Sequence, residues 1–335
     1  MKKGESIMIE NAYDVTIIGA GPVGMYAAFY ASLRKLNVKI IDALPELGGQ
    51  LQALYPEKYI YDIPGFLEIK AGDFVKNLQE QMESVKDNIE IVLNERVEYV
   101  RRNDNSDILE ICTDKLCHYT KTIIVTAGKG AFQARTLGLE GEEDYTNIYY
   151  FVNDMNKFKD RRVAIFGGGD SAVDWANMLN GVSKEVYVIH RRDSFRAHEH
   201  SVEQMMNSDV KVLTPYTAKA LEGKSGLVNK IHLTGEEGEE IIEVDDVIVL
   251  YGFLSSLGPI ETWDLTLQDK ALVVNSYQAT NIQGVYAAGD ACTYEGKVKM
   301  ITCGLGEATV AVNSAYGYVY PNKKNAPVFS SALKR

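Results

Sequence analysis

The chain has 335 residues, of which 46% are apolar and 24% charged, and its formal net charge at pH 7 is −11. No apolar run approaches the roughly 20 residues that span a bilayer, and Met1 to Asn11 lacks a signal-peptide core. The acidic balance argues against nucleic acid as a partner, because phosphate contacts need a basic face. The length predicts two domains, and four scattered cysteines favour a reducing, cytoplasmic compartment.

A glycine-rich turn lies near the N-terminus. The apolar run Val15 to Ile18 predicts a buried strand. The glycines of a GxGxxG pattern follow it directly: Gly19, Gly21 and Gly24. The first permits a tight turn, the second lets backbone approach a pyrophosphate, and the third lets the helix pack on the strand. The next strand, Val38 to Ile41, ends at Asp42, where a carboxylate usually binds a ribose hydroxyl.

The following segment predicts one helix and a small antiparallel sheet. Apolar periodicity indicates a helix near Gly72 to Lys86. The strand-like stretches after it are Val97 to Arg101, Leu109 to Cys112 and Thr122 to Thr126. Cys112 and Cys117 flank a predicted hairpin turn, and we expect both to be buried, inert thiols.

A second glycine turn follows the apolar run Val163 to Phe166. Its fingerprint residues are Gly167, Gly169 and Ala172, with Asp170 and Ser171 between them. The next strand, Glu185 to Ile189, ends in basic residues instead of an acid: His190, Arg191, Arg192 and, slightly later, Arg196. Guanidinium groups bind a 2′-phosphate that a carboxylate would repel. The pattern therefore predicts NADP(H) rather than NAD(H), and the alternative is a solvated basic loop.

Two further segments complete the predicted elements. The acidic run Glu236 to Glu243 predicts a hairpin loop, and Gly306 to Tyr320 predicts a helix. Between them, Gly284 to Ala288 reads as an extended strand that ends in Gly289 and Asp290. None of the five histidines has metal-ligand spacing with other donors, so we expect no metal site.

The strand before Asp290 resembles a segment of the pyridine-nucleotide-disulfide oxidoreductase superfamily. The matching positions are Thr280, Val285, Tyr286, Ala287, Gly289 and Asp290. In that superfamily the aspartate contacts the flavin ribityl and phosphate, which implies FAD at the first turn and NADPH at the second. The implied fold is α/β, thioredoxin-reductase-like, with two Rossmann-like domains of three ββα layers. The NADPH domain (125–255) would be inserted in a discontinuous FAD domain (1–124 and 256–335).

The redox cysteine pair of the thioredoxin-reductase branch is missing. That branch carries Cys-x-x-Cys just before its NADPH strand, whereas Asn147 to Arg162 contains no cysteine here. The four cysteines are Cys112, Cys117, Cys292 and Cys303, and no two have the spacing of a redox dithiol. We therefore expect electrons to leave the flavin without an internal dithiol.

Over essentially its whole length the chain resembles the ferredoxin–NADP+ reductases of thioredoxin-reductase-like type. The stretches that carry the resemblance include Leu47 to Leu51, Tyr55 to Asp62, His190 to His200 and Tyr251 to Pro259. The family implies a homodimer with FAD, NADPH as hydride donor to flavin N5, and ferredoxin or flavodoxin as one-electron acceptor. The implied FAD contacts beyond the glycine turn are Asp42, Gln50, Tyr55, Val97, Phe132, Asp290 and Ser331. Tyr55 and Phe329 would stack on the flavin, and no side-chain acid or base is required.

Alternatives to this interpretation remain open. Cys292 and Cys303 flank the Asp290 segment, which keeps a disulfide or quinone reductase possible, and an NADPH-dependent redox sensor without turnover is the third reading. The negative net charge argues against an acidic ferredoxin, although it does not set the sign of a local patch. The lysines near flavin-site segments would supply such a patch or lie on the plain surface: Lys58, Lys129, Lys297 and Lys299.

Overall fold

The computed structural model describes residues 12–102, 107–152, 154–236 and 238–329. It separates into two compact units. Met1–Ala131 with Ser255–Arg335 forms the discontinuous unit, and Phe132–Leu254 forms the inserted unit. The first division falls after residue 131, near the predicted boundary at residue 124, and the strand that ends at Val125 belongs to the sheet of the discontinuous unit.

One sheet organises the discontinuous unit, with the strand order β5-β2-β1-β8-β7-β6 and β21 also paired to β8. Its strands are β1 (Tyr13–Ile18), β2 (Val38–Ile41), β5 (Ile89–Val92), β6 (Val97–Arg102), β7 (Leu109–Thr113), β8 (Cys117–Val125) and β21 (Val285–Ala287). β8 changes partner along its length. It pairs antiparallel with β7 up to Thr120 and parallel with β21 from Ile123. The predicted hairpin between Cys112 and Cys117 is therefore present.

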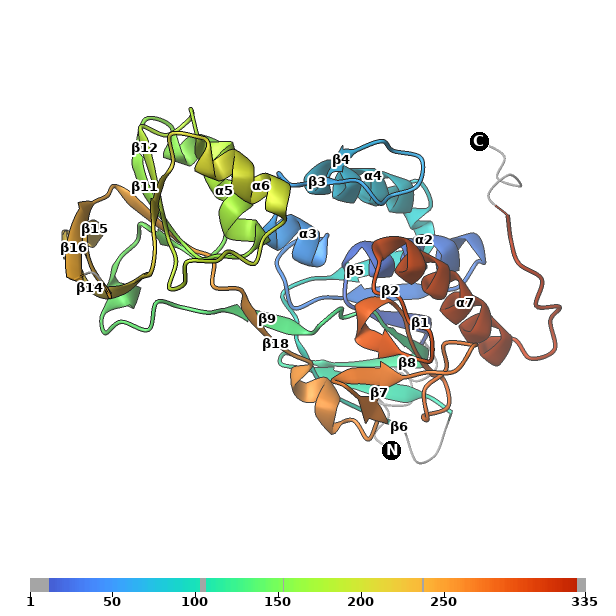
Figure 1. Ribbon diagram of the computed structural model, residues 1–335. Coiled ribbons are helices and arrows are strands. Elements are labelled where there is room, and N and C mark those ends of the chain that lie inside the picture. Colours follow the sequence, from blue (N-terminus) through green and yellow to red (C-terminus); the bar gives the residue numbers. More distant parts are fainter. Residues whose placement is uncertain (1–11, 103–106, 153, 237, 330–335) are drawn as a thin grey trace. The chain divides into compact units, whose positions relative to one another are not determined.

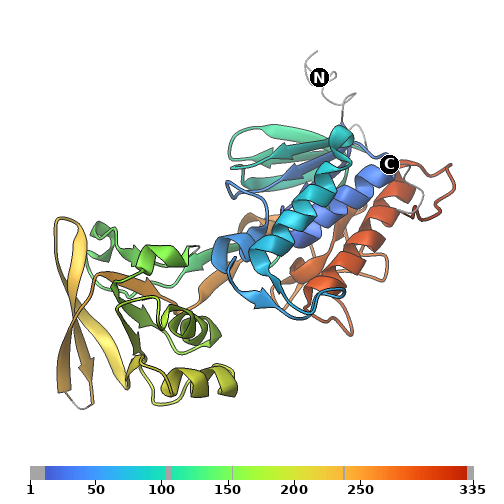
Figure 2. The same ribbon diagram turned by 90° about the horizontal axis from the view of Figure 1, so that it is seen from above.

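Alternation along the strands divides the core of this unit into two layers. Val15 and Ile17 of β1 face the helices, whereas Ile18 faces a second cluster that contains Leu109 and Ile111 of β7. Helix α2 lies between α4 and α7 on the helical face, as the blue, teal and red helices of Figure 2 show. The helices are α2 (Pro22–Leu33), α3 (Gly49–Leu54), α4 (Ala71–Glu83) and α7 (Ile301–Val319).

Two predicted helices of this unit occur with shifted ends. The apolar positions of α4 are buried as its periodicity indicated. Helix α7 begins at Ile301, ahead of the predicted Gly306, although Gly304 and Gly306 are poor helix formers. Tertiary packing outweighs this low helix propensity. Glycine at position 304 lets α7 approach α2 closely, because an added Cβ there would lie 2.7 Å from the Val23 side chain.

Short elements complete the discontinuous unit. They are the paired β3 (Tyr59–Ile60) and β4 (Ile69–Lys70), the small sheet of β19 (Leu267–Gln268), β20 (Ala271–Val273) and β22 (Cys292–Thr293), and the 3₁₀ turns η1 (Lys86–Asn88), η4 (Gly258–Thr262) and η5 (Gly289–Ala291).

The inserted unit repeats the layered plan with other strands. Its parallel sheet has the order β10-β17-β11-β12-β13, and an antiparallel sheet has the order β14-β15-β16. The strands are β10 (Ile148–Tyr149), β11 (Arg162–Phe166), β12 (Glu185–Ile189), β13 (Lys211–Leu213), β14 (Tyr216–Lys224), β15 (Leu227–Gly235), β16 (Gly238–Glu243) and β17 (Asp246–Val249). The helical elements are α5 (Asp170–Leu179), α6 (Glu199–Met206), η2 (Glu142–Asp144) and η3 (Met155–Phe158).

The two faces of this parallel sheet bury different neighbours. Val163 and Ile165 of β11 face the helical side, and Ala164 and Phe166 face the antiparallel sheet. Figure 1 shows α5 and α6 on one side of β11 and β12 and the three antiparallel strands on the other. Both units therefore have the three ββα layers predicted from the sequence, and the expected fold class is confirmed.

One predicted loop is a strand. The acidic run that was expected to be a hairpin loop contains β16, which pairs with β15 from Lys230 to Gly235. Alternation explains the strand, because Ile242 is buried while Ile241 is exposed. The acidic side chains are partly neutralised, as Glu239 pairs with Lys219.

Two paired strands link the units: β9 (Ala131–Ala134) and β18 (Phe253–Ser256). Within the discontinuous unit, Gly130 lies against the Ser256 carbonyl, where an added Cβ would come within 2.0 Å of the oxygen. Of the helices that the structure describes, none combines the length and the apolarity needed to cross a membrane.

The packing of α2 on β1 yields a prediction. A Cβ at Gly24 would lie 1.9 Å from the Gly19 carbonyl oxygen, whereas at Gly21 the nearest atom would be 4.0 Å away. We expect Gly24→Ala to lower the free energy of unfolding by about 2 kcal/mol or more, because the backbone of α2 must move away from the backbone of Gly19. Gly306→Ala is the control, because no atom lies within 4 Å of an added Cβ at this position inside α7, and it should not lower the free energy of unfolding. Urea unfolding measures both, and equal stabilities would contradict the packing described here.

Candidate functional site

The first glycine turn brings backbone segments into direct contact. Gly19 has a φ of +108°, and an added Cβ there would lie 2.6 Å from the Thr126 carbonyl oxygen at the end of β8. The Thr126 hydroxyl donates a 2.7 Å hydrogen bond to the Gly19 carbonyl. Gly21 is the N-cap of α2, and the atom nearest to an added Cβ there would be the Gly49 Cα atom, 4.0 Å away. A pyrophosphate could approach unpaired N–H groups there.

Asp42 lies beside this turn, at the end of β2. Its carboxylate accepts hydrogen bonds from the backbone N–H groups of Ala20 at 2.5 Å and Leu44 at 2.8 Å. Burial raises the pKa of Asp42, and these N–H donors oppose that rise. Each carboxylate oxygen has a further lone pair, so Asp42 can still accept hydrogen bonds from ribose hydroxyls.

Helix α3 adds two predicted residues to the same region. The Gly48 N–H donates to the Ala20 carbonyl at 2.9 Å, which joins the start of α3 to the glycine turn. Gln50 lies near Gly128, where an added Cβ would be 3.7 Å from its Nε2 atom. Burial raises the pKa of Tyr55, and the negative charge of Asp290 raises it further. Tyr55 and Asp290, which are far apart in the sequence, are therefore neighbours in the fold.

For the other predicted flavin contacts within the described ranges, the structure gives the burial or the element rather than a contact with the first glycine turn. The Val97 side chain is 7% exposed and belongs to the core, so only its backbone is available to a ligand. Phe132 falls on β9, and Ser331 lies outside the described residues. Phe329 is 71% exposed, and the described part of the chain contains no ring contact between it and Tyr55. Its stacking role remains a prediction.

The second glycine turn has the same backbone design. An added Cβ at Gly167 would lie 2.6 Å from the Leu250 carbonyl oxygen and 2.9 Å from the Ala172 Cβ atom. Ala172 is fully buried, as the third fingerprint position requires. Gly169 is the N-cap of α5, and no atom lies within 4 Å of an added Cβ there.

The basic segment after β12 folds back onto this turn. The Arg196 N–H donates to the Gly168 carbonyl at 2.6 Å, and the His198 N–H donates to Asp170 Oδ1 at 3.0 Å. The His190 ring covers Gly168, where an added Cβ would meet it at 2.4 Å. Burial lowers the pKa of His190, and the charges of the nearby arginines lower it further. Arg191, Arg192 and Arg196 are exposed, and within the described ranges none of them forms an ion pair.

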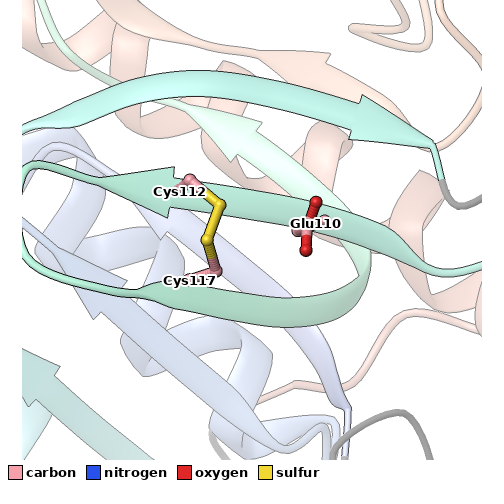
Figure 3. A group of neighbouring side chains, drawn as sticks. All are labelled: Glu110, Cys112 and Cys117. Carbon is pink, nitrogen blue, oxygen red and sulfur yellow. A yellow bond between two sulfur atoms is a disulfide. The ribbon is translucent and has the colours of Figure 1, made fainter. Parts of the chain in front are cut away.

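Two of the four cysteines form a disulfide. Cys112 and Cys117 face each other across β7 and β8 and are joined, so the expectation of inert thiols is wrong. Direct cross-strand pairing brought the two sulfurs together, and the sequence showed only their hairpin spacing. The disulfide also weakens the compartment argument based on unclustered cysteines. Figure 3 shows it beside Glu110, the third member of a possible metal-ligand group. Joined sulfurs are not thiolate ligands.

This disulfide is remote from the glycine turn. It lies at the start of β8, whereas Thr126 follows the end of the strand. Nine residues at about 3.3 Å per residue place the two ends of β8 about 26 Å apart. Cys292 is fully buried, and burial together with the charge of Glu307 raises the pKa of its thiol to about 12. The disulfide pair and Cys292 therefore place no thiolate at the turn, and Cys303 is unpaired and partly exposed.

Both turns fit dinucleotides by their geometry. At each turn a glycine caps a helix, and no atom lies closer than 4.0 Å to a Cβ added at that glycine. A carboxylate follows the next strand in one unit, and arginines follow it in the other. This arrangement defines an oxidoreductase with two dinucleotide sites. Residues 13–315 match the family model of pyridine nucleotide-disulphide oxidoreductases. The chain belongs to this family, which confirms the superfamily inferred from the Asp290 segment.

Similar proteins agree in sequence and in fold. The ferredoxin–NADP reductase 2 of Bacillus cytotoxicus is 52% identical over 328 residues, which is 97% of this chain and 98% of that protein. The ferredoxin–NADP reductase of Geobacillus thermodenitrificans is 51% identical over 327 residues, covering 96% and 98%. The thioredoxin reductase structure from Lactococcus lactis has a TM-score of 0.74 at 24% identity, covers 92% of this chain and 99% of its own, and shows the fold.

Two residues near Asp290 were not recognised as site residues from the sequence. Lys297 was placed among the surface or patch lysines, yet its side chain is 5% exposed and pairs with Glu307, which is equally buried. The available signal was Glu307 itself, which occupies an inward position between Gly304 and Ala308 on α7. An acid on the buried face of a helix requires a partner.

The state of the cysteines yields a prediction. We expect iodoacetamide to modify Cys303 but not Cys292 in the native protein at mildly alkaline pH, because Cys292 stays a protonated thiol until the pH approaches about 12. Unfolding should make Cys292 reactive, and only a reductant should release Cys112 and Cys117. Peptide mass spectrometry identifies the alkylated sites. Native labelling of Cys292 as fast as that of Cys303 would show that its surroundings are wrongly described.

Proposed function

We propose that this chain is an FAD-dependent reductase that transfers electrons between NADPH and ferredoxin or flavodoxin. The observation that carries the proposal is the placement of the sulfurs relative to the first glycine turn. A thiol relay would need a reactive cysteine at the flavin, whereas here the only disulfide among the described residues lies at the far end of β8 and the Cys292 thiol is buried with a raised pKa. The naming of the Bacillus and Geobacillus relatives supports the same acceptor class.

The residues of the discontinuous unit fit FAD. The N-terminus of α2 would face the pyrophosphate, and Asp42 would accept the ribose hydroxyls. Asp290 would hold the ribityl end, with Gln50 and Tyr55 beside the flavin. Phe329 and Ser331 complete the proposed set of this unit, and Phe132, the first residue of the inserted unit, stays in the set by the resemblance alone. Bound FAD and NADPH supply hydride and single-electron transfer, while the protein binds and orients them.

The residues of the inserted unit fit NADPH. The α5 N-terminus, with Gly167, Gly169 and Ala172, would face the pyrophosphate. Arg191, Arg192 and Arg196 offer planar donors for a 2′-phosphate, and no carboxylate takes the place that Asp42 has in the other unit. The lowered pKa of His190 favours the neutral ring at neutral pH. The ring would therefore line the site beside Gly168 without adding a positive charge. Ser171 at the start of α5 adds a hydroxyl.

The compartment, the oligomeric state and the partners are also part of the proposal, and they rest on the sequence and its resemblance to the ferredoxin–NADP reductases. We place the enzyme in the cytoplasm as a homodimer, without a nucleic-acid or membrane partner. Lys58, Lys129 and Lys299 are exposed, and Lys129 and Lys299 are the ones that we assign to an acidic partner protein. Lys297 is removed from that group, because its ammonium is buried against Glu307.

Cofactor choice tests the inserted unit. We expect Arg191→Ala with Arg192→Ala to raise the KM for NADPH at least about tenfold with little effect on NADH, because each charged hydrogen bond contributes about 1.5 to 3 kcal/mol. Lys157→Ala with Lys159→Ala removes the same charge from exposed positions of this unit and serves as the control. Steady-state dye reduction with both nucleotides measures the effect. An unchanged NADPH preference in the arginine variant would place the phosphate site elsewhere.

The route of the electrons tests the acceptor. With Cys112, Cys117, Cys292 and Cys303 replaced by serine, NADPH-driven ferredoxin reduction should continue at a similar rate, since no thiol takes part. Folding and FAD content are checked first, and Cys112→Ser with Cys117→Ser is the control for loss of the disulfide alone. Thioredoxin reduction should be negligible in every variant. Efficient thioredoxin turnover by the wild type, lost in the serine variant, would make the chain a disulfide reductase.

A further inference from the structure

We propose that the buried ion pair of Lys297 and Glu307 positions the Gly289–Asp290 turn, and through it the carboxylate that faces the flavin dinucleotide. The inference rests on the proposed function, because it assigns these side chains a role at the same cofactor site. Both are positioning residues, since each acts through the backbone of Gly289.

The pair joins two segments that flank the turn. Lys297 lies in the loop between β22 and α7, and Glu307 lies on the buried face of α7. The Lys297 Nζ atom is 2.5 Å from Oε1 and 2.6 Å from Oε2 of Glu307. Each side chain is only 5% exposed. The two charges are thus largely removed from water and directed at each other.

Both members of the pair also bind the same residue, Gly289. The Gly289 N–H donates to Glu307 Oε2 at 2.8 Å, and Lys297 Nζ donates to the Gly289 carbonyl at 2.9 Å. The carbonyl lies in the peptide plane that contains the Asp290 nitrogen, because the peptide bond is planar. Holding this oxygen therefore fixes the plane from which the Asp290 side chain projects.

The backbone at this point admits few alternatives. Gly289 has a φ of +75°, which glycine adopts readily, and an added Cβ would lie 3.2 Å from Val23. An added Cβ at Gly304 of α7 would lie 3.2 Å from the Gly289 Cα atom. The first turn of α7 therefore rests directly on the turn before Asp290.

Stability alone does not account for the pair. Removing two charges from water costs about as much as their attraction returns, and apolar replacements of similar volume are often neutral or stabilising. Glu307 also accepts from the Tyr294 hydroxyl at 2.7 Å and lies 3.6 Å from the Cys292 sulfur. The pair thus has all its hydrogen-bonding groups engaged, and two of those bonds go to the residue that precedes Asp290.

FAD release from the purified holoprotein tests the inference. We expect Lys297→Met with Glu307→Leu to accelerate FAD dissociation at least about tenfold, because Gly289 loses both charged partners. Removing the charges together avoids leaving one of them buried alone. Flavin fluorescence after dilution gives the rate, and circular dichroism checks the fold. Lys299→Met, the same substitution at an exposed lysine two residues away, should release FAD at the wild-type rate.

Two further variants separate positioning from general support of the core. Tyr294→Phe deletes one hydrogen bond to Glu307 but leaves both bonds to Gly289, so FAD release should be unchanged. Lys297→Met with Glu307→Gln leaves no charge buried alone and keeps an oxygen acceptor for the Gly289 N–H, so it should accelerate release less than Lys297→Met with Glu307→Leu. If the variant with Glu307→Leu does not fold, this milder variant carries the test, and a wild-type release rate would overturn the inference.

A double-mutant cycle that combines the Lys297 and Glu307 substitutions with Asp290→Ala decides whether the pair acts through the Asp290 carboxylate. Once Asp290 is absent, replacing Lys297 and Glu307 should accelerate FAD release no further, because the positioned group is gone. An equal acceleration in both backgrounds would overturn the inference alone and leave the proposed function standing. A folded wild type that holds no FAD and takes up none would overturn the proposed function and this inference together.

Discussion

The close approach of backbone to backbone at the first glycine turn is the constraint on which the discontinuous unit depends. Gly19 and Gly24 let α2 lie against β1 with no side chain between them, and Thr126 from the end of β8 completes the contact. A side chain at either glycine would separate the helix from the sheet. Val23 of α2 in turn meets Gly289 and Gly304. The segment before Asp290 and the start of α7 are thereby built around the same turn.

The two units use one backbone design for two electrostatic purposes. In each, a glycine turn frees a helix N-terminus, and the end of the next strand decides what may bind beside it. The first unit places there a carboxylate held by two N–H groups, which suits hydroxyl donors. The second places an imidazole and exposed arginines, held in position by the bond from Arg196 to Gly168. A negative phosphate group would be repelled at the first and attracted at the second.

Charge burial and sulfur chemistry are linked near Asp290. Burial and the charge of Glu307 raise the pKa of the Cys292 thiol, while the bonds of Glu307 to Lys297 and Gly289 keep its carboxylate in place. A sulfur that lies close to a candidate flavin site is thus kept protonated and buried. The disulfide that does form belongs to the edge of the antiparallel layer, where β7 and β8 meet in register. Position in the fold, more than the number of cysteines, argues against a relay through Cys112, Cys117 or Cys292.

The sequence by itself determined the repeated strand–glycine–helix units, the contrast between Asp42 and the arginines, and the amphipathic face of α4. These are local patterns, since spacing along a strand or helix fixes which side chains share a face. Tertiary structure alone decided the disulfide, the strand in the acidic run, the early start of α7 and the Lys297–Glu307 pair. Each depends on what a neighbouring segment supplies: a facing strand for Cys112, an alternating partner for Ile242, a close backbone for Gly304. From the sequence, a lysine in a loop is expected to be solvated. Only the fold shows that a buried carboxylate lies against it, because burial and pairing are properties of the packed chain.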